Sequence, residues 1–187
     1  MIDTHPHIGT NKLPKIIAKM RENILAAGGE VHFDCRVEDF IIKEQKIKGV
    51  IDQNGNTIEG HAVILATGHS ARDIFYLLYK HKILIEAKSF AMGVRIEHPQ
   101  PIIDAAQYRC DVRSKYLPAA SYKFVHQVNG KGVFSFCMCP GGHIVPSATA
   151  PGEVVVNGMS ASTRSSRYAN SGMVVAIEPG DLQAYSK

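Results

Sequence analysis

The feature that most constrains the fold is the stretch HAVILATGHSARD at residues 61–73. Ala62–Ala66 is an unbroken apolar run, which is typical of a strand buried on both faces. A glycine turn follows, and then Ser70 and Asp73 have the spacing of a capping box, which marks the start of a helix. The stretch therefore predicts a buried strand, a glycine turn and a helix over residues 71–82.

The chain before this stretch predicts a helix, a strand and an antiparallel meander. Apolar residues recur on one helical face over residues 13–27, and Gly28 ends that helix. Residues 30–37 alternate apolar and polar side chains, as in a strand with one buried face. The run over residues 40–60 contains a hairpin signal at Asn54-Gly55, and it predicts short antiparallel strands.

After residue 86 the pattern becomes mainly β. A short helix is expected at residues 102–108, and a polar loop at residues 161–171. Asn129-Gly130 predicts a hairpin turn. The expected strands are residues 90–98, 121–128, 131–139, 153–160 and 173–179. The predicted fold class is therefore α/β, of the α+β kind.

The composition excludes several classes of function. Of 187 residues, 45% are hydrophobic and 20% are charged, as in ordinary globular proteins. The net charge of +4 is scattered, which argues against a nucleic-acid partner. No apolar run approaches the ~20 residues of a membrane helix, and the first residues lack the pattern of a signal peptide. A cytoplasmic protein with reduced cysteines and no membrane partner is expected.

Five stretches, taken together and in order, identify a resemblance that covers nearly the whole chain. They resemble the uncharacterised FAD-dependent dehydrogenases of bacteria, in the glutathione-reductase-like flavoprotein superfamily. The resemblance implies an FAD-dependent oxidoreductase acting on a small molecule, with NAD(P)H as a candidate electron donor. In that superfamily a buried strand ends in Ala-Thr-Gly beside the FAD, after an antiparallel meander. The stretches are HPHIGTNKLPKII, ILATGHSARDIFYLL, KSFAMGVRIEHPQ, FSFCMCPGGHIV and NGMSASTRSSRYANS.

One departure from the family pattern bears on domain organisation. The family begins with a strand and a G-x-G-x-x-G turn that hold the FAD pyrophosphate, and this sequence has no such fingerprint. The family also continues past the end of this chain. We therefore expect an internal piece of a longer flavoprotein, whose remainder is its partner. Residues 1–86 would be the C-terminal portion of an FAD-binding domain, and 87–187 an inserted, incomplete, mainly β substrate domain. The piece alone would bind FAD weakly or not at all, and would be inactive.

The resemblance places some residues beside the cofactor. Val37 corresponds to the position whose backbone meets adenine. Ala66, Thr67 and Gly68 would lie beside FAD, where glycine permits close approach and the threonine hydroxyl can bond a phosphate or ribose. The alternative for these three residues is a plain strand-to-helix turn.

The stretch HPHIGTN precedes a helix, whose N-terminus offers free N–H groups to an anion. His5, His7 and Thr10 are therefore candidates to face flavin or substrate. The alternative is a capped loop with surface histidines.

Substrate contacts are predicted at three places on the mainly β half. Arg95 shares a strand face with Glu97 and can anchor a carboxylate or phosphate, or else form a cross-strand salt bridge. By resemblance, Cys137 and Cys139 lie near the flavin ring. The alternative is a pair of small buried hydrophobes, and a disulfide between them would need a bulge. Asn157, Arg164 and Asn170 are the polar groups of a loop, either functional or simply solvated.

No residue is identified as an acid, base or nucleophile, so the flavin would carry the redox chemistry. Two other functions remain open at this point. One is a non-catalytic ligand-binding or scaffolding domain. The other is a thiol- or zinc-regulated module built on the Cys-Met-Cys stretch.

The cysteine spacing yields a first prediction. No C-x-x-C pair is present and no set of four ligands has zinc spacing, so the purified chain should contain no stoichiometric zinc. Elemental analysis tests this. One zinc per chain, lost in Cys139→Ser, would contradict it and favour the zinc-regulated module.

Overall fold

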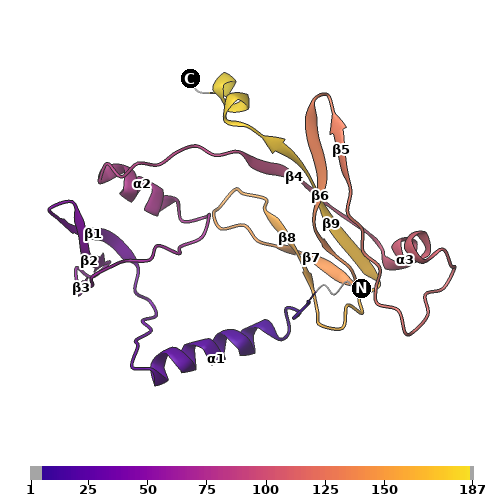
Figure 1. The fold of residues 1–187 in the computed structure, drawn as a ribbon, viewed down its shortest axis with the longest axis horizontal. Coiled ribbons are helices and arrows are strands. Elements are labelled where there is room, and N and C mark those ends of the chain that lie inside the picture. Colours follow the sequence, from indigo (N-terminus) through magenta and orange to yellow (C-terminus); the bar gives the residue numbers. More distant parts are fainter. Residues whose placement is uncertain (1–5, 186–187) are drawn as a thin grey trace. The chain divides into compact units, whose positions relative to one another are not determined.

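The computed structural model describes residues 6–185, with only the backbone described for 183–185. This part of the chain has a mixed α/β fold with antiparallel sheets and three α-helices (Figure 1). The elements are α1 (Leu13–Ala26), β1 (Val37–Lys43), β2 (Lys46–Asp52), β3 (Thr57–Glu59), α2 (Arg72–Lys80), β4 (Phe90–Pro99), α3 (Gln100–Tyr108), β5 (Val125–Val128), β6 (Lys131–Cys139), β7 (Gly142–Pro146), β8 (Val156–Ser160), β9 (Tyr168–Ile177) and the 3₁₀ helix η1 (Pro179–Tyr185).

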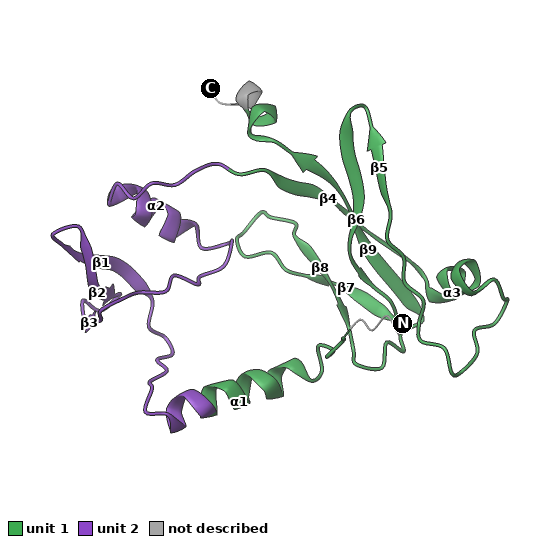
Figure 2. Cartoon of the chain, in the orientation of Figure 1, with its two compact units in different colours: residues 1–22, 88–187 green, residues 23–87 purple. Residues whose placement is uncertain are grey.

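The chain divides into two compact units, coloured separately in Figure 2. Unit 1 combines residues 1–22 with residues 88–187, and unit 2 is residues 23–87. The N-terminal loop and most of α1 therefore belong with the C-terminal half. Assignment of these parts to an FAD domain and an inserted substrate domain stays a prediction.

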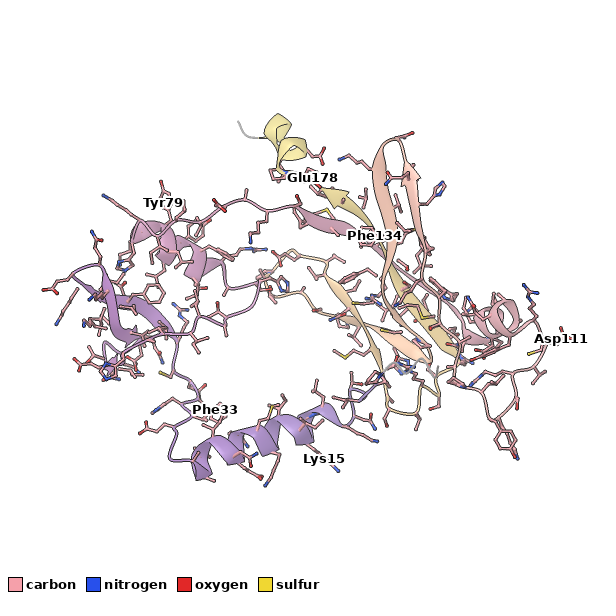
Figure 3. The ribbon with its side chains drawn as sticks, viewed as in Figure 1. Lys15, Phe33, Tyr79, Asp111, Phe134 and Glu178 are labelled. Atoms are coloured by element: carbon pink, nitrogen blue, oxygen red, sulfur yellow. The ribbon has the colours of Figure 1, made fainter. Side chains whose placement is uncertain are left out.

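Unit 1 is built on a four-stranded antiparallel sheet in the order β4-β9-β6-β5. β9 is bonded to β4 along its whole length, from Tyr168 opposite Pro99 to Ile177 opposite Phe90. On its other side β9 pairs with β6, where Phe134, labelled in Figure 3, lies between β5 and β9. The predicted strand over residues 131–139 and its Asn-Gly hairpin turn are confirmed.

The prediction of a polar loop at residues 161–171 is wrong for its last part. β9 begins at Tyr168, so Asn170 lies in a strand. The backbone of residues 168–172 completes the ladder with β4, and the buried Asn170 side chain bonds Arg95. Polar composition concealed this strand. The hairpin partner of β8, which is β7, was also not predicted.

Unit 2 consists of the predicted meander with α2 packed against it. β1, β2 and β3 form an antiparallel sheet whose first turn contains Glu44 and Gln45, both with positive φ. Phe40 of β1 packs with Ile74 and Leu77 of α2 to form the buried cluster of this unit. The meander and the helix over residues 71–82 are confirmed.

Two strands expected in this unit are not formed. Residues 30–36 are irregular, with Asp34 at φ 52° and an exposed Phe33 (Figure 3). Residues 62–66 are also irregular, and Ile64 is 91% exposed. Both predictions rested on side-chain pattern, whereas a strand also needs a neighbour to bond. No described strand pairs with either segment.

The periodicity of apolar residues predicted the helices better than the capping signals did. α1 runs over Leu13–Ala26, as predicted from its periodicity, and none of its residues is buried. The predicted capping box of α2 is wrong, because Ala71 is the N-cap and makes no side-chain cap bond. The Asp73 carboxylate instead accepts the N–H of Ile74, the next residue.

None of the helices within residues 6–185 has the length and apolar character required to cross a membrane.

A charged contact ties α2 to the meander. Asp39 of β1 accepts hydrogen bonds from Lys80 Nζ at 2.8 Å and lies 2.5 Å from His81 Nε2. The hydrogen bond from Lys80, followed by that from His81, holds the pKa of Asp39 well below its usual range. The charged form of Asp39 is therefore favoured by folding.

Asp39→Asn should destabilise unit 2 by about 1 kcal/mol at neutral pH, because the Asp39 side chain is 31% exposed and water screens the pair. A carboxylate whose pKa is lowered by folding stabilises the fold fully at a pH above its pKa in the unfolded chain, which is about 4. That contribution is lost as the pH falls further. Urea unfolding followed by circular dichroism should therefore show a variant deficit that shrinks on acidification below about pH 4. Asp34→Asn, at an exposed position with positive φ, is the matched control. A deficit that persists unchanged at the acidic end would contradict the ion-pair explanation.

Candidate functional site

The N-terminal loop, residues 6–12, lies against the C-terminal end of β8. The Thr10 backbone N–H and hydroxyl both donate to Ser160 O, at 3.0 and 3.2 Å. His7 Nε2 lies 3.0 Å from Ala161 O, so it is the nitrogen that carries a proton and donates. These bonds join positions about 150 residues apart in the chain.

Gly9 makes this docking possible. It has φ 87°, and a Cβ at this position would lie 2.2 Å from Ser162 N. Asn11 then completes the contact, because its Oδ1 accepts the Ser162 N–H at 2.9 Å. The glycine of the HPHIGTN stretch is therefore required by close backbone approach.

The second component is the turn CMCPGG, residues 137–142, which we call the thiol turn. The register between β6 and β9 shifts between Phe136 and Cys139, and Cys137 has φ 45°, so β6 contains a bulge at this point. Gly141 has φ 52°, and a Cβ there would lie 1.8 Å from Arg164 O. The turn thus packs directly against the loop that carries Arg164.

The bulge sends the two cysteines to different cavities. Cys137 lines a cavity of about 700 Å³ together with Tyr122 and Phe124, which we call the aromatic cavity. Cys139 lines a cavity of about 400 Å³ together with the N-terminal loop, which we call the loop cavity. Both cysteines are free thiols, and the bulge separates them instead of pairing them.

The loop cavity brings together residues that the sequence predicted from distant stretches. His7 and Thr10 come from the N-terminal loop, Cys139 from the thiol turn, and Arg164 from the loop before β9. All four lie in unit 1. Four of the predicted residues, from three distant stretches, therefore line one cavity.

Arg164 is the residue that the two cavities share, with Met138 and Pro140. It has φ 49°, and its Nε is buried without a hydrogen-bond partner among the described residues. Buried N–H groups are nearly always satisfied in folded proteins. An acceptor supplied by a ligand would satisfy this one.

Arg95 lies beneath the thiol turn and lines neither cavity. Its Nη1 donates to Asn170 Oδ1 at 2.6 Å and to Cys137 O at 3.1 Å, and it lies 4.0 Å from Cys139 Sγ. No ion pair to Glu97 occurs within the described part of the chain. In this arrangement Arg95 stabilises the bulge by its hydrogen bond to the Cys137 carbonyl. Its role as a substrate anchor stays a prediction.

A buried polar network that the sequence analysis missed supports the thiol turn. Gln100 is 3% exposed, and its Oε1 accepts the Gly141 N–H at 2.8 Å. Its Nε2 donates to Asp104 Oδ1 and to Ala120 O. Asp104 also accepts the Ala120 N–H and bonds Arg113 Nε at 2.8 Å. The available signal was the i, i+4 pair of Gln100 and Asp104 in a helix predicted too short to include the glutamine.

The remaining predicted residues lie elsewhere. Asn157 is on β8, where its Oδ1 accepts the Gly158 N–H, and it lines neither cavity. Val37 begins β1 and lines a small pocket beside α2, and Ala66–Gly68 is an irregular segment, all in unit 2. Gly68 has φ 75°, as a tight turn requires. His5 lies outside the described residues.

The site offers cations, thiols and aromatic rings, but no metal cluster. Among residues 6–185, no group of three or more histidine, cysteine, aspartate or glutamate side chains is arranged to hold a metal ion. Among the described residues, the carboxyl groups with a clearly lowered pKa are those of Asp39, Asp52 and Asp181, and they line neither cavity.

Comparison with known proteins adds two findings. Residues 89–187 match the family described as "FAD-dependent protein, C-terminal domain-like". An uncharacterised protein of Clostridium beijerinckii is 40% identical over 186 residues, which covers 98% of this chain and 35% of that protein. The chain thus spans about one third of the length of this relative.

The contact between the thiol turn and Arg164 is testable by glycine substitution. Gly141→Ala should destabilise unit 1 by about 2 kcal/mol or more, because the added Cβ overlaps a backbone carbonyl that cannot rotate away. Gly132→Ala, at the other end of β6, is the control, since its Cβ would meet only the end of Gln127 at 3.8 Å and should change stability by less than about 0.5 kcal/mol. Equal urea midpoints for the two variants would show that the close approach does not exist in solution.

Proposed function

The chain belongs to the FAD-dependent protein family defined by this C-terminal domain, and we propose that it is part of an FAD-dependent oxidoreductase acting on a small molecule. In this proposal the flavin supplies the electron transfer, and the chain supplies binding and orientation. Within the oxidoreductases, we assign it to the dehydrogenases of the glutathione-reductase-like superfamily.

The observation that carries the proposal is the position of Arg164. The residues that match the family, 89–187, include the thiol turn, Arg164 and every residue that lines the two cavities except those of the N-terminal loop and Leu13. An arginine with a buried, unpartnered Nε between two cavities fits an electron-rich acceptor, which a flavin ring or an acidic substrate provides. His7, Thr10 and Cys139 form the walls of the loop cavity, the part that we assign to the cofactor side.

The residues present fit only part of the cofactor. His7 and Thr10 use their side-chain donors on carbonyl groups of the protein, so they shape the loop cavity and leave Arg164 as its charged donor. The glycine fingerprint that would hold the pyrophosphate is absent from the sequence. We therefore assign Val37 and Ala66–Gly68 to an adenine and ribose wall and no residue of this chain to the phosphates.

We further propose that the chain is an internal piece of a longer flavoprotein. The alignment with the Clostridium beijerinckii protein covers 35% of that protein's length. In addition, residues 62–66 have the composition of a buried strand but no strand partner among the described residues. The exposed Ile64 and the uncovered apolar face of α1 are surfaces that further chain would bury.

These proposals predict different flavin binding by the chain and by its full-length parent. Since the phosphate grip is missing, the 187-residue chain should be colourless and bind FAD weakly at most, whereas the parent should be yellow. Titration of FAD into both proteins, followed by flavin fluorescence, measures the difference. Tight binding by the chain alone would mean that the cofactor is held elsewhere than proposed. A parent without flavin affinity would refute the oxidoreductase and leave a non-catalytic binding domain.

A further inference from the structure

The aromatic cavity has the size of a small-molecule site and lies wholly within unit 1. Its volume is about 700 Å³, inside the range of roughly 300–1,000 Å³ usual for ligand pockets. Its walls are the segment that leads into β5 and the bulged end of β6, with Arg164 at the junction with the loop cavity. A molecule held here would be next to the proposed cofactor side.

One wall of this cavity is a row of aromatic rings. The Tyr122 and Phe124 rings are stacked with centroids 6.0 Å apart and an interplanar angle of 22°. Behind Tyr122, and outside the lining of the cavity, the His98 ring lies 5.6 Å from the Tyr122 ring. A planar ring can join such a pair by offset stacking or by an edge-to-face contact.

The charge of the lining is entirely positive. Lys123 and Arg164 line the cavity, and no aspartate or glutamate among the described residues does so. The Arg164 Nε still requires an acceptor. Carboxylates satisfy arginine donors with short, charge-assisted hydrogen bonds, so an acidic group fits this end of the cavity.

Hydrogen bonds within the protein hold the backbone of the cavity walls. The Asp104 carboxylate accepts the Ala120 N–H at 2.8 Å, and Gln100 Nε2 donates to Ala120 O at 3.0 Å, so both backbone groups of Ala120 are held just before Tyr122. Phe124 is held to β6 by its N–H and C=O, each bonded to Ser135. Rigid walls lower the ordering cost of binding.

We propose that the aromatic cavity binds an aromatic carboxylate, with its ring against Tyr122 and Phe124 and its carboxylate on Arg164. The proposal rests on the proposed function, because it names the substrate class of that oxidoreductase. Cys137 lines the same cavity and is exposed, so its thiol reports on occupancy.

Binding can be measured on the chain itself, without flavin. The probes are 4-fluorobenzoate and the neutral 4-fluorobenzamide, which share a ring and differ in charge, and ¹⁹F NMR titration gives both dissociation constants. The acid should bind saturably and at least about tenfold more tightly than the amide, the difference expected for a hydrogen bond to a charged group.

Variants then assign the contacts. Arg164→Gln should weaken 4-fluorobenzoate about tenfold and leave 4-fluorobenzamide unchanged, whereas Tyr122→Leu should weaken both probes. Arg167→Gln is the matched control, since Arg167 lies in the same loop over the Tyr168 ring and lines neither cavity. Lys123→Gln, at an exposed position, provides a second charge variant if Arg164→Gln does not fold.

Thiol labelling supplies an independent readout. Saturating 4-fluorobenzoate should slow alkylation of Cys137 by N-ethylmaleimide several-fold, with Cys35 of unit 2 unaffected, as followed by site-resolved mass spectrometry. Equal affinity for acid and amide, no saturable binding of the acid at millimolar concentration, or equal losses in Arg164→Gln and Arg167→Gln would each overturn the proposal. If the parent lacks flavin but the chain binds the acid through Arg164, the proposed function fails and the anion site stands.

Discussion

The backbone ladder of β9 is the interaction on which unit 1 depends. β9 is bonded to β4 along its whole length and, on its other side, to β6 between Asn170 and Val175. It also places Asn170, which is fully buried, where Arg95 of β4 can bond it. A buried amide left without that donor would be costly, so the strand pairing and the polar contact support one another.

The bulge in β6 follows from this arrangement and shapes the site. The Arg95 guanidinium donates to the carbonyl of Cys137, a backbone acceptor that the interrupted ladder leaves free. Gly158 of β8 packs over the same place, where a Cβ would lie 2.1 Å from Arg95 Nη1. The Cys137 carbonyl in the bulge is therefore hydrogen-bonded, and the glycine at position 158 lets β8 pack closely over Arg95. As a local result, the two thiols line two different cavities, the proposed cofactor side and the proposed substrate side.

Sequence pattern predicted the elements that are specified locally. The meander with its Asn54-Gly55 turn, α1, α2 and the alternating strand β4 each follow from spacing or turn residues within a few positions. The failures are segments whose state depends on distant partners. Residues 62–66 have the composition of a strand but no neighbouring strand among the described residues. Asn170 is polar, yet it lies in a strand, where its side-chain oxygen accepts a hydrogen bond from Arg95.

The candidate site divides in the same way. The sequence singled out His7 by its place just before a helix N-terminus, Arg164 as a polar group of a predicted loop, and Cys139 by resemblance. Their convergence on shared cavities depends on how β8 and the thiol turn pack, which spacing does not encode. The aromatic wall was hidden for another reason, since Tyr122 and Phe124 have the ordinary composition of a strand.

The docking of the N-terminal loop has a consequence for biosynthesis. Thr10 bonds the carbonyl of a residue 150 positions later. At a synthesis rate of about 5–20 residues per second, the loop leaves the ribosome on the order of ten seconds before its acceptor. All of residues 23–87 emerges in the interval, and closure of so long a segment carries an entropic cost. We therefore expect the N-terminal loop and α1 to stay undocked on a nascent chain, and accessible to chaperones, at least until β8 has emerged.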